Sequence, residues 1–465
     1  MSDIAPEHPN RCGTEDQASG THSQDCGTMP EPLPWWAQVG RDSRRFTPRR
    51  MLIGGALIFL VGLVTWINYP FLPDYKILLF NRPTTKLSSN SPPGQWSMNG
   101  RDLDQSRYVD SLSRQPVGRL LWSQDLGEPT LSAPVVMDGV VYVGSHFKVL
   151  ALDAETGRTI WERKATGPVD SSAAVAGDNL YVGFLDRRLV ALNLETGETR
   201  WEFKTRGHIT SSPVVDNGIV YSGSWDGSIY ALDAATGDRI WKYETGGSVR
   251  FQPTIHDGVL VAAANDGKLY VLNARTGQDR LRFRTPKSAT APPAMANEVA
   301  YLPAAGTLYA LDTTTKEIPG QYQFKQLWAL GYLWQVPGVP RPPGQQSSLW
   351  RFAPEGSSSS IVAAPAVTED VIYIGDLQGN FYALDALTGM GLWRFQAEGG
   401  ISTSPVIAGD QVYFGTRDGF LYALNRFDGG INWRLSLGAS IDISPAFSGG
   451  RLYIRTNDGW LHAVQ

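Results

Sequence analysis

One short motif recurs along the chain at intervals of about forty residues, and this repeat constrains the fold more than any other feature. Each copy has an Asp or Asn, a tight polar turn, and a Trp or Leu eight residues after the Asp or Asn. The copies occupy residues 151–161, 191–201, 231–241, 271–281, 383–393 and 423–433, with a broken copy at 310–317. The period predicts a ring or stack of similar units.

Each unit alternates β-branched and aromatic residues with turn pairs such as Asn217-Gly218, which predicts four short antiparallel strands. The third-strand pattern starts at Val149, Leu189, Ile229, Leu269, Leu308, Phe381, Leu421 and Leu461. We therefore predict an all-β, eight-bladed β-propeller. The last unit has no fourth strand, whereas an orphan strand at residues 118–126 precedes the first, so we expect this strand to close the ring.

The repeated polar and aromatic residues have a structural interpretation. The Asp or Asn accepts hydrogen bonds from the turn that follows, and the repeated Gly supplies a positive φ. We expect the aromatic column to dock each blade on its neighbour through Trp122, Trp161, Trp201, Trp241, Trp393 and Trp433. A ligand-binding stack is the alternative, but period-locked aromatics are normally packing.

The motif Ala-x-Asp-x-x-Thr-Gly-x-x-x-Trp, with the lead-in segment 95–112, resembles the pyrroloquinoline quinone (PQQ)-like β-propeller repeat family over residues 95–465. That family includes quinoprotein dehydrogenases and the propeller lipoprotein of the outer-membrane assembly machinery. The resemblance implies the fold, and an activity only by analogy.

For the dehydrogenase branch, the resemblance implies PQQ with Ca²⁺, a vicinal Cys pair, calcium ligands and an Asp base. The propeller part of this sequence contains no cysteine, and no segment matches those catalytic motifs. We therefore expect no catalytic residue and no cofactor, and keep PQQ with Ca²⁺ as the alternative.

Before the propeller, residues 51–68 are uncharged and long enough as a helix to cross a bilayer. Five arginines precede this stretch, so we expect a single-pass inner-membrane protein with a cytoplasmic N-terminus and a periplasmic propeller. Residues 1–50 have the composition of a disordered tail, and residues 69–94 of a linker. The net charge of −4 and the lack of a basic stripe give no reason to expect nucleic-acid binding.

Both cysteines lie in the tail, in two blocks that share His-x-x-x-Cys-Gly-Thr. Two imidazoles and two thiolates are a ligand set that tetrahedral zinc uses. The candidate ligands are His8, Cys12, His22 and Cys26. Chance spacing in a disordered tail is the competing interpretation.

The innermost strand of each blade lines the central channel of a propeller. Three residues before its repeated Pro, the chain carries mostly polar side chains, including Asp170, Arg250 and Asp442. The preceding position is mostly apolar, as alternation requires if one column faces the channel and the other packs between blades. These three charges are either a solvated channel mouth or a site for a polar ligand, with Arg250 contacting an anion.

An insertion at residues 317–350 lengthens the fifth unit by about thirty residues relative to the repeat. It is rich in Pro, Gln and aromatics. Either it packs on its own blade, with Trp328 or Trp350 in the docking position, or Trp328, Tyr332 and Trp334 form a patch for a protein partner.

Three function classes follow from these features. The first is a monomeric, membrane-anchored scaffold that binds envelope proteins, and the second is a PQQ-dependent oxidoreductase. A third is a periplasmic ligand sensor that signals through the single helix. The missing catalytic motifs favour the scaffold.

Overall fold

The computed structural model describes residues 54–62, 77, 81–110, 114–315, 321–341, 347–354, 356 and 360–465. The chain separates into two units, residues 1–63 and 64–465. Residues 54–62 are helical, and no helix within the described ranges is long and apolar enough to cross a membrane. The tail, with His8, Cys12, His22 and Cys26, and most of the segment 51–68 lie outside these ranges.

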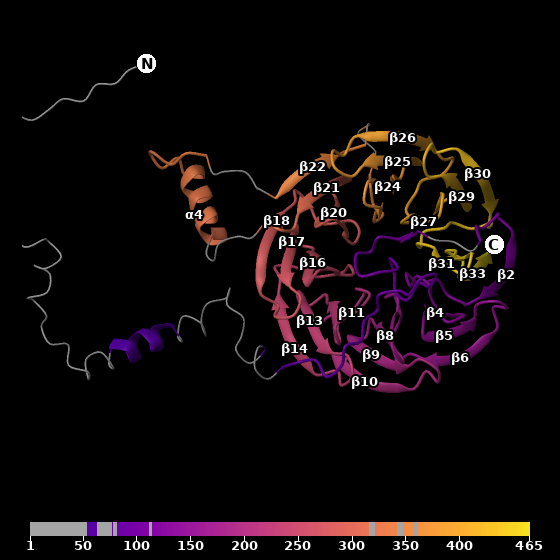
Figure 1. Ribbon diagram of the computed structural model, residues 1–465, viewed down its shortest axis with the longest axis horizontal. Coiled ribbons are helices and arrows are strands. Elements are labelled where there is room, and N and C mark those ends of the chain that lie inside the picture. The colour runs from indigo at the N-terminus through magenta and orange to yellow at the C-terminus, as the bar shows by residue number, and fades with distance from the viewer. Residues whose placement is uncertain are drawn as a thin grey trace, which may run out of the picture. The chain divides into compact units, whose positions relative to one another are not determined.

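The strands of the second unit form eight sheets arranged as a ring (Figure 1), which confirms the predicted eight-bladed propeller. The first four blades are β3–β6 (Val135–Met137, Val140–Ser145, Lys148–Asp153, Thr159–Lys164), β7–β10 (Ala174–Ala176, Asn179–Gly183, Arg188–Asn193, Thr199–Lys204), β11–β14 (Val214–Asp216, Ile219–Gly223, Ser228–Asp233, Arg239–Glu244) and β15–β18 (Thr254–His256, Val259–Ala264, Lys268–Asn273, Asp279–Arg284).

The other four blades include one interrupted by an insertion and one completed by the start of the chain. They are β19–β22 (Ala294–Ala296, Val299–Ala304, Thr307–Asp312, Ser348–Phe352), β23–β26 (Ala366–Val367, Val371–Gly375, Asn380–Asp385, Gly391–Gln396), β27–β30 (Val406–Ala408, Gln411–Gly415, Phe420–Asn425, Ile431–Ser436) and β31–β33 (Ala446–Ser448, Arg451–Arg455, Trp460–Val464) with β2 (Leu120–Asp125). Helix α4 (Gln321–Leu333) lies between β21 and β22.

The ring is closed by the N-terminal strand, as predicted. β2 pairs antiparallel with β33, with Trp122 opposite Ala463. A second N-terminal strand, β1 (Tyr108–Val109), pairs in parallel with β27 and gives that blade a fifth strand. The chain therefore joins its own last two blades through residues near its start.

The inner three strands of each blade are buried on both faces, because neighbouring blades cover them. β12, for example, is buried along its whole length. The outermost strands alternate instead: β10 exposes every second residue to solvent. This pattern places the apolar core between blades and leaves the rim of the ring polar.

Residues 89–110, which we call the strap, cross one end of the central channel and bind all eight blades, seven through their innermost strands and the eighth through the residue after β31. Figure 1 shows this indigo segment crossing the middle of the ring. The backbone pairs, in blade order, are Val136 with Trp96, Val175 with Ser97, Val215 with Ser89, Ile255 with Leu103, Met295 with Asp104, Val367 with Ser106, Ile407 with Arg107 and Gly449 with Gly94, at 2.7–3.3 Å.

The strap closes its end of the channel with fully buried side chains. Trp96, Met98, Gln105 and Arg107 are each at most 1% exposed. Residues before the strap, which we assigned to a linker, also contact the blades: the backbone N–H of Thr84 donates to Asp233 at 2.7 Å. Ile77 is also buried, and its carbonyl accepts from Arg275 at 3.3 Å, so the described residues before the strap are held by the blades.

Candidate functional site

Among the described residues, seven tryptophans pack against the neighbouring blade, or, for Trp433, against the segment just before β2. The indole N–H of Trp161 donates to the Leu194 carbonyl at 3.1 Å, and its ring covers Gly197, where a Cβ would lie 2.8 Å from the indole. The same pair of contacts recurs at Trp122, Trp201, Trp241, Trp350, Trp393 and Trp433. These side chains are engaged in packing between blades.

The docked tryptophans have a partner column that the motif analysis missed. Tyrosines on the second strand of seven blades lie with ring centroids 5.8–6.1 Å from a docked indole: Tyr142, Tyr181, Tyr221, Tyr301, Tyr373, Tyr413 and Tyr453. Several share the carbonyl that the indole uses, as when Tyr181 donates to Ala234 at 2.9 Å. Burial raises the pKa of Tyr181 to about 12, so its hydroxyl remains a donor.

The predicted channel-mouth residues lie in separate surroundings. The Arg250 guanidinium stacks 4.4 Å from the centre of the Trp225 ring, whose indole N–H donates to Thr210 at 3.0 Å. Asp442 accepts from Ser402 at 2.7 Å and pairs with Arg417 at 3.3 Å.

Asp170 lies elsewhere on the ring and accepts from the backbone N–H of Leu131 at 3.4 Å. The cavity that Arg250 helps to line measures about 10 Å³, which is the space of roughly one water molecule. The three charges that the sequence grouped together thus contact different neighbours.

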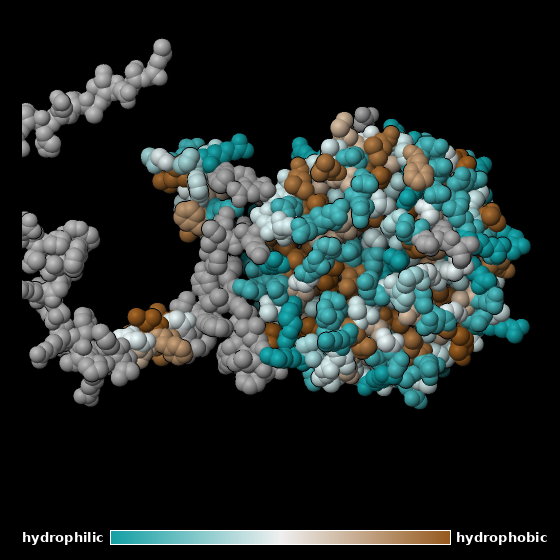
Figure 2. All heavy atoms as spheres, viewed as in Figure 1, coloured by the Kyte–Doolittle hydropathy of each residue, from teal (hydrophilic) through white to brown (hydrophobic). Residues whose placement is uncertain are grey.

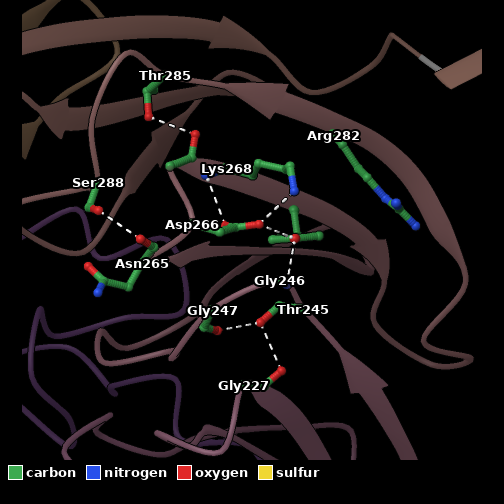
Figure 3. Close-up of polar contacts among 12 residues, drawn as sticks. Gly227, Thr245, Gly246, Gly247, Asn265, Asp266, Lys268, Arg282, Thr285 and Ser288 are labelled. Atoms are coloured by element: carbon green, nitrogen blue, oxygen red, sulfur yellow. Dashed lines mark hydrogen bonds and ion pairs between the residues drawn. The ribbon is translucent and has the colours of Figure 1, made fainter. Parts of the chain in front are cut away.

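Other acidic side chains near this face fasten the loops. Figure 3 shows Asp266, in the turn between β16 and β17, bonded to Lys268 at 2.7 Å. Asp266 also accepts from the Tyr270 hydroxyl at 2.8 Å, which in turn accepts from the backbone N–H of Gly246 at 3.0 Å. In the same view, Thr245 bridges two loop carbonyls. The carboxylate therefore holds two loops together and has a structural role.

Within the described ranges, no group of three or more His, Cys, Asp or Glu side chains is arranged to hold a metal ion. The two cysteines of the chain are Cys12 and Cys26, outside the described propeller. PQQ with Ca²⁺ stays the alternative that the sequence left open.

The insertion contains a helix that the sequence did not predict. Its aromatic residues divide between two roles: Trp350, on β22, fills the docking position of its blade, while Trp328 donates to the Pro340 carbonyl at 2.8 Å within the insertion. Trp334 is 75% exposed and Tyr332 is 44% exposed. Figure 2 shows brown, hydrophobic atoms on α4.

Comparison with known proteins agrees with this architecture. The chain is 36% identical over 121 residues to the quinohemoprotein alcohol dehydrogenase ADH-IIG of Pseudomonas putida, a match that covers 22% of this chain and 17% of the relative. The chain thus spans only about a sixth of that relative's length. It is 30% identical over 121 residues to the dehydrogenase subunit of a quinone alcohol dehydrogenase of Komagataeibacter europaeus, covering 22% of this chain and 16% of that relative.

Solved structures with the same fold come from both functional branches. BamB from Moraxella catarrhalis aligns with a TM-score of 0.59 at 19% identity, covering 74% of this chain and 97% of that one. The quinohemoprotein alcohol dehydrogenase from Comamonas testosteroni aligns with a TM-score of 0.63 at 16% identity, covering 80% and 81%. At these identities the likeness concerns the fold alone.

A family model described as "Outer membrane protein assembly factor BamB" matches residues 145–282, 226–343 and 340–465, well over half of the chain. With the repeat, the docked tryptophans and the ring of eight sheets, this match means that the chain belongs to the PQQ-like β-propeller repeat family, related to BamB and to quinoprotein alcohol dehydrogenases.

Proposed function

We propose that this protein is a non-catalytic, monomeric interaction scaffold of the cell envelope, anchored in the inner membrane by residues 51–68 with its propeller on the periplasmic side. The observation that carries the proposal is the exposed apolar surface of α4 and the residues after it. Phe324, Leu327, Leu333 and Trp334 are 63–75% exposed. Large exposed side chains of this kind are the usual anchors of a protein partner.

The insertion has the composition of a binding element. A helix with apolar side chains exposed along its length stabilises a complex by burying them in a groove of the partner. Neither α4 nor the loop up to residue 341 contains an acidic residue, and the only charges are Lys325 and Arg341. Charge depletion with aromatic enrichment is typical of interface cores.

The acidic side chains at the predicted channel mouth and in the nearby loops support the same proposal. Asp442 and Asp266 are each bonded to neighbouring side chains or loops. Groups used in this way are poor candidates for proton transfer, which needs a group within reach of substrate. A PQQ-dependent dehydrogenase remains the competing function, because the matched stretches of the curated relatives belong to such enzymes.

Site-specific photocrosslinking in cells tests the scaffold. A photoreactive residue at position 334 should crosslink to a discrete protein, whereas one at Leu387, an 85% exposed residue on a blade turn, should not. No adduct at position 334, or the same adducts at both positions, contradicts the proposal. Dye reduction by purified protein with PQQ, Ca²⁺ and an alcohol would instead establish the enzyme.

A further inference from the structure

A cavity of about 810 Å³ lies on the strap side of the ring, and residues 101–110 form one of its walls. Residues 101–107 form consecutive turns, with positive φ at Gln105 (53°) and Arg107 (55°), and the backbone N–H of Gln105 donates to the Asp102 carbonyl at 3.0 Å. Gln105 and Arg107 are buried toward the ring, at 0% and 1% exposure, while Asp104 and Tyr108 line the cavity. The volume is within the range of small-molecule sites.

Blades four to seven supply the other walls, with an apolar part at the rim. Phe427 and Leu392 line the cavity and are 65% and 54% exposed. The Arg426 guanidinium lies 4.8 Å from the centre of the Phe427 ring and 5.4 Å from that of Tyr108. A ligand that entered here would cover apolar surface that the propeller leaves in water.

The polar lining is predominantly negative. Carboxylates come from the strap and from the turn between β23 and β24: Asp102, Asp104, Asp110, Glu369 and Asp370. Arg101 pairs with Asp102 at 3.3 Å, and Arg426 contributes the other guanidinium. The lining thus carries more carboxylates than cationic groups.

One of these carboxylates is held in an unfavourable environment. Asp104 accepts from His256 at 2.8 Å, yet burial raises its pKa to about 6. Burial disfavours the ionised carboxylate, and a cation placed beside it offsets that cost. At the rim, the adjacent residues Glu369 and Asp370 are exposed in the bend between β23 and β24. Together these three side chains place negative charge both inside the cavity and at its mouth.

We propose that this cavity binds an organic cation, an ammonium or guanidinium group carried on an apolar body. The cation lies among Asp104, Glu369 and Asp370, and the apolar body covers Phe427 and Leu392. A free amine and a Lys or Arg side chain of a peptide share this chemistry. The cavity and α4 are made of different residues, so the site does not depend on the scaffold function.

Calorimetric titration of the full-length protein in a neutral detergent tests this site. Cyclohexylmethylamine should bind saturably, and cyclohexylmethanol, which has the same shape without the charge, should bind at least tenfold more weakly. Equal binding of the two compounds, or binding of neither, would overturn the proposal.

Variants locate the binding. Glu369→Gln with Asp370→Asn should weaken amine binding at least tenfold with no loss of folded protein, because both side chains are exposed. The matched control is Glu198→Gln, an exposed glutamate on a turn of the second blade, which should leave binding unchanged. Undiminished binding by the double variant, or an equal loss in the control, contradicts the site.

A peptide probe distinguishes the two sources of the cation. Acetyl-Leu-Lys-amide should compete with the amine for the same site. Tighter binding of the peptide than of the amine assigns the site to a basic segment of a protein, and the reverse order assigns it to a free amine. A peptide that binds unchanged to the Glu369→Gln, Asp370→Asn variant counts against the cavity.

Discussion

The guanidinium of Arg455 donates a hydrogen bond to the hydroxyl of Thr130 at 2.9 Å, across the seam between the eighth blade and the first. In most other blades the position of Arg455 is a glycine that lies against a Val or Ile of the next blade. At Gly183, for example, a Cβ would come 2.4 Å from Ile209. The seam therefore replaces an apolar contact by a buried polar one, with both members of the pair changed.

Replacing Arg455 and Thr130 by the residue types of the other blades tests whether the two positions are energetically coupled. Arg455 is fully buried and also donates to the carbonyls of Gly144 and Glu128, so Arg455→Gly should cost about 3 kcal/mol of unfolding free energy. Thr130→Val should cost about 1–3 kcal/mol, because it removes one partner of a buried charge. The double variant should be more stable than the sum of the two predicts, by about 1 kcal/mol or more in chemical denaturation. Additive losses would show that the two positions are independent.

The docking contacts predict a difference between two glycines of similar conformation. Gly389 has a φ of +71° and a Cβ there would meet the Trp350 indole at 2.5 Å, whereas at Gly258, with a φ of +72°, nothing lies within 4 Å. In Gly258→Ala the free energy of unfolding should fall by about 1–2 kcal/mol, because alanine adopts a positive φ less readily than glycine. In Gly389→Ala it should fall by about 1–3 kcal/mol more, because the new Cβ also pushes the Trp350 ring out of place. Equal losses in thermal or chemical unfolding would contradict the docking role.

Removal of the insertion should leave the propeller intact. The docking tryptophan of that blade, Trp350, comes from β22, after the insertion, and hydrogen-bonds Ala386 at 3.1 Å. Replacing residues 317–346 by a short glycine-serine linker should therefore change the melting temperature by no more than about 2 °C, the shift of roughly 1 kcal/mol in a domain of this size. The same variant should no longer bind the protein that position 334 crosslinks to in the intact chain. A large drop in melting temperature would show that α4 is part of the core.

The closing strand pair contains a histidine that makes stability depend on pH. His462 contacts the Ser123 hydroxyl at 2.8 Å and Thr456 at 3.2 Å, and burial lowers its pKa below the usual 6.5. A lowered pKa means that the unfolded chain takes up the proton more readily. The contribution of His462 to stability is therefore present above pH 6.5 and is lost as the pH falls through the folded-state pKa.

Thermal unfolding measured at pH values across this range tests that contribution. The unmodified protein should lose more stability on acidification than His462→Asn does. The control is His146→Asn, at a partly exposed position on the first blade, which should follow the unmodified protein. If all three proteins lose the same stability on acidification, His462 does not cause the pH dependence.

The fold could be predicted from the sequence because the repeat is read eight times. A docked indole such as Trp161 leaves the same local pattern in most units, and the third-strand pattern recurs in all eight, so chance matches are averaged out. The tyrosine column could have been found in the same way, since Tyr142 and Tyr181 recur with the same period. The strap could not, because it occurs once and its partners come from all the blades.

The candidate site was harder to predict for the same reason. Alternation separated a polar from an apolar column, but the columns lie just before the innermost strands, which begin at residues such as Val135 and Ala174. It also did not show that Arg250 stacks on Trp225. The cation-binding cavity depends on Asp104 and Glu369, which lie far apart in the sequence and in different elements. Contacts of this kind are set by the closed ring and have no local signature.

The pairing of β2 with β33 has a consequence for how the protein is made. Ala463, the partner of Trp122 across the two strands, is synthesised more than three hundred residues after it. Until β33 has been made, β2 has exposed backbone hydrogen-bonding groups and no native neighbour. Folding of the ring therefore cannot be completed during synthesis of the first seven blades, and β2 remains an unpaired edge throughout that time.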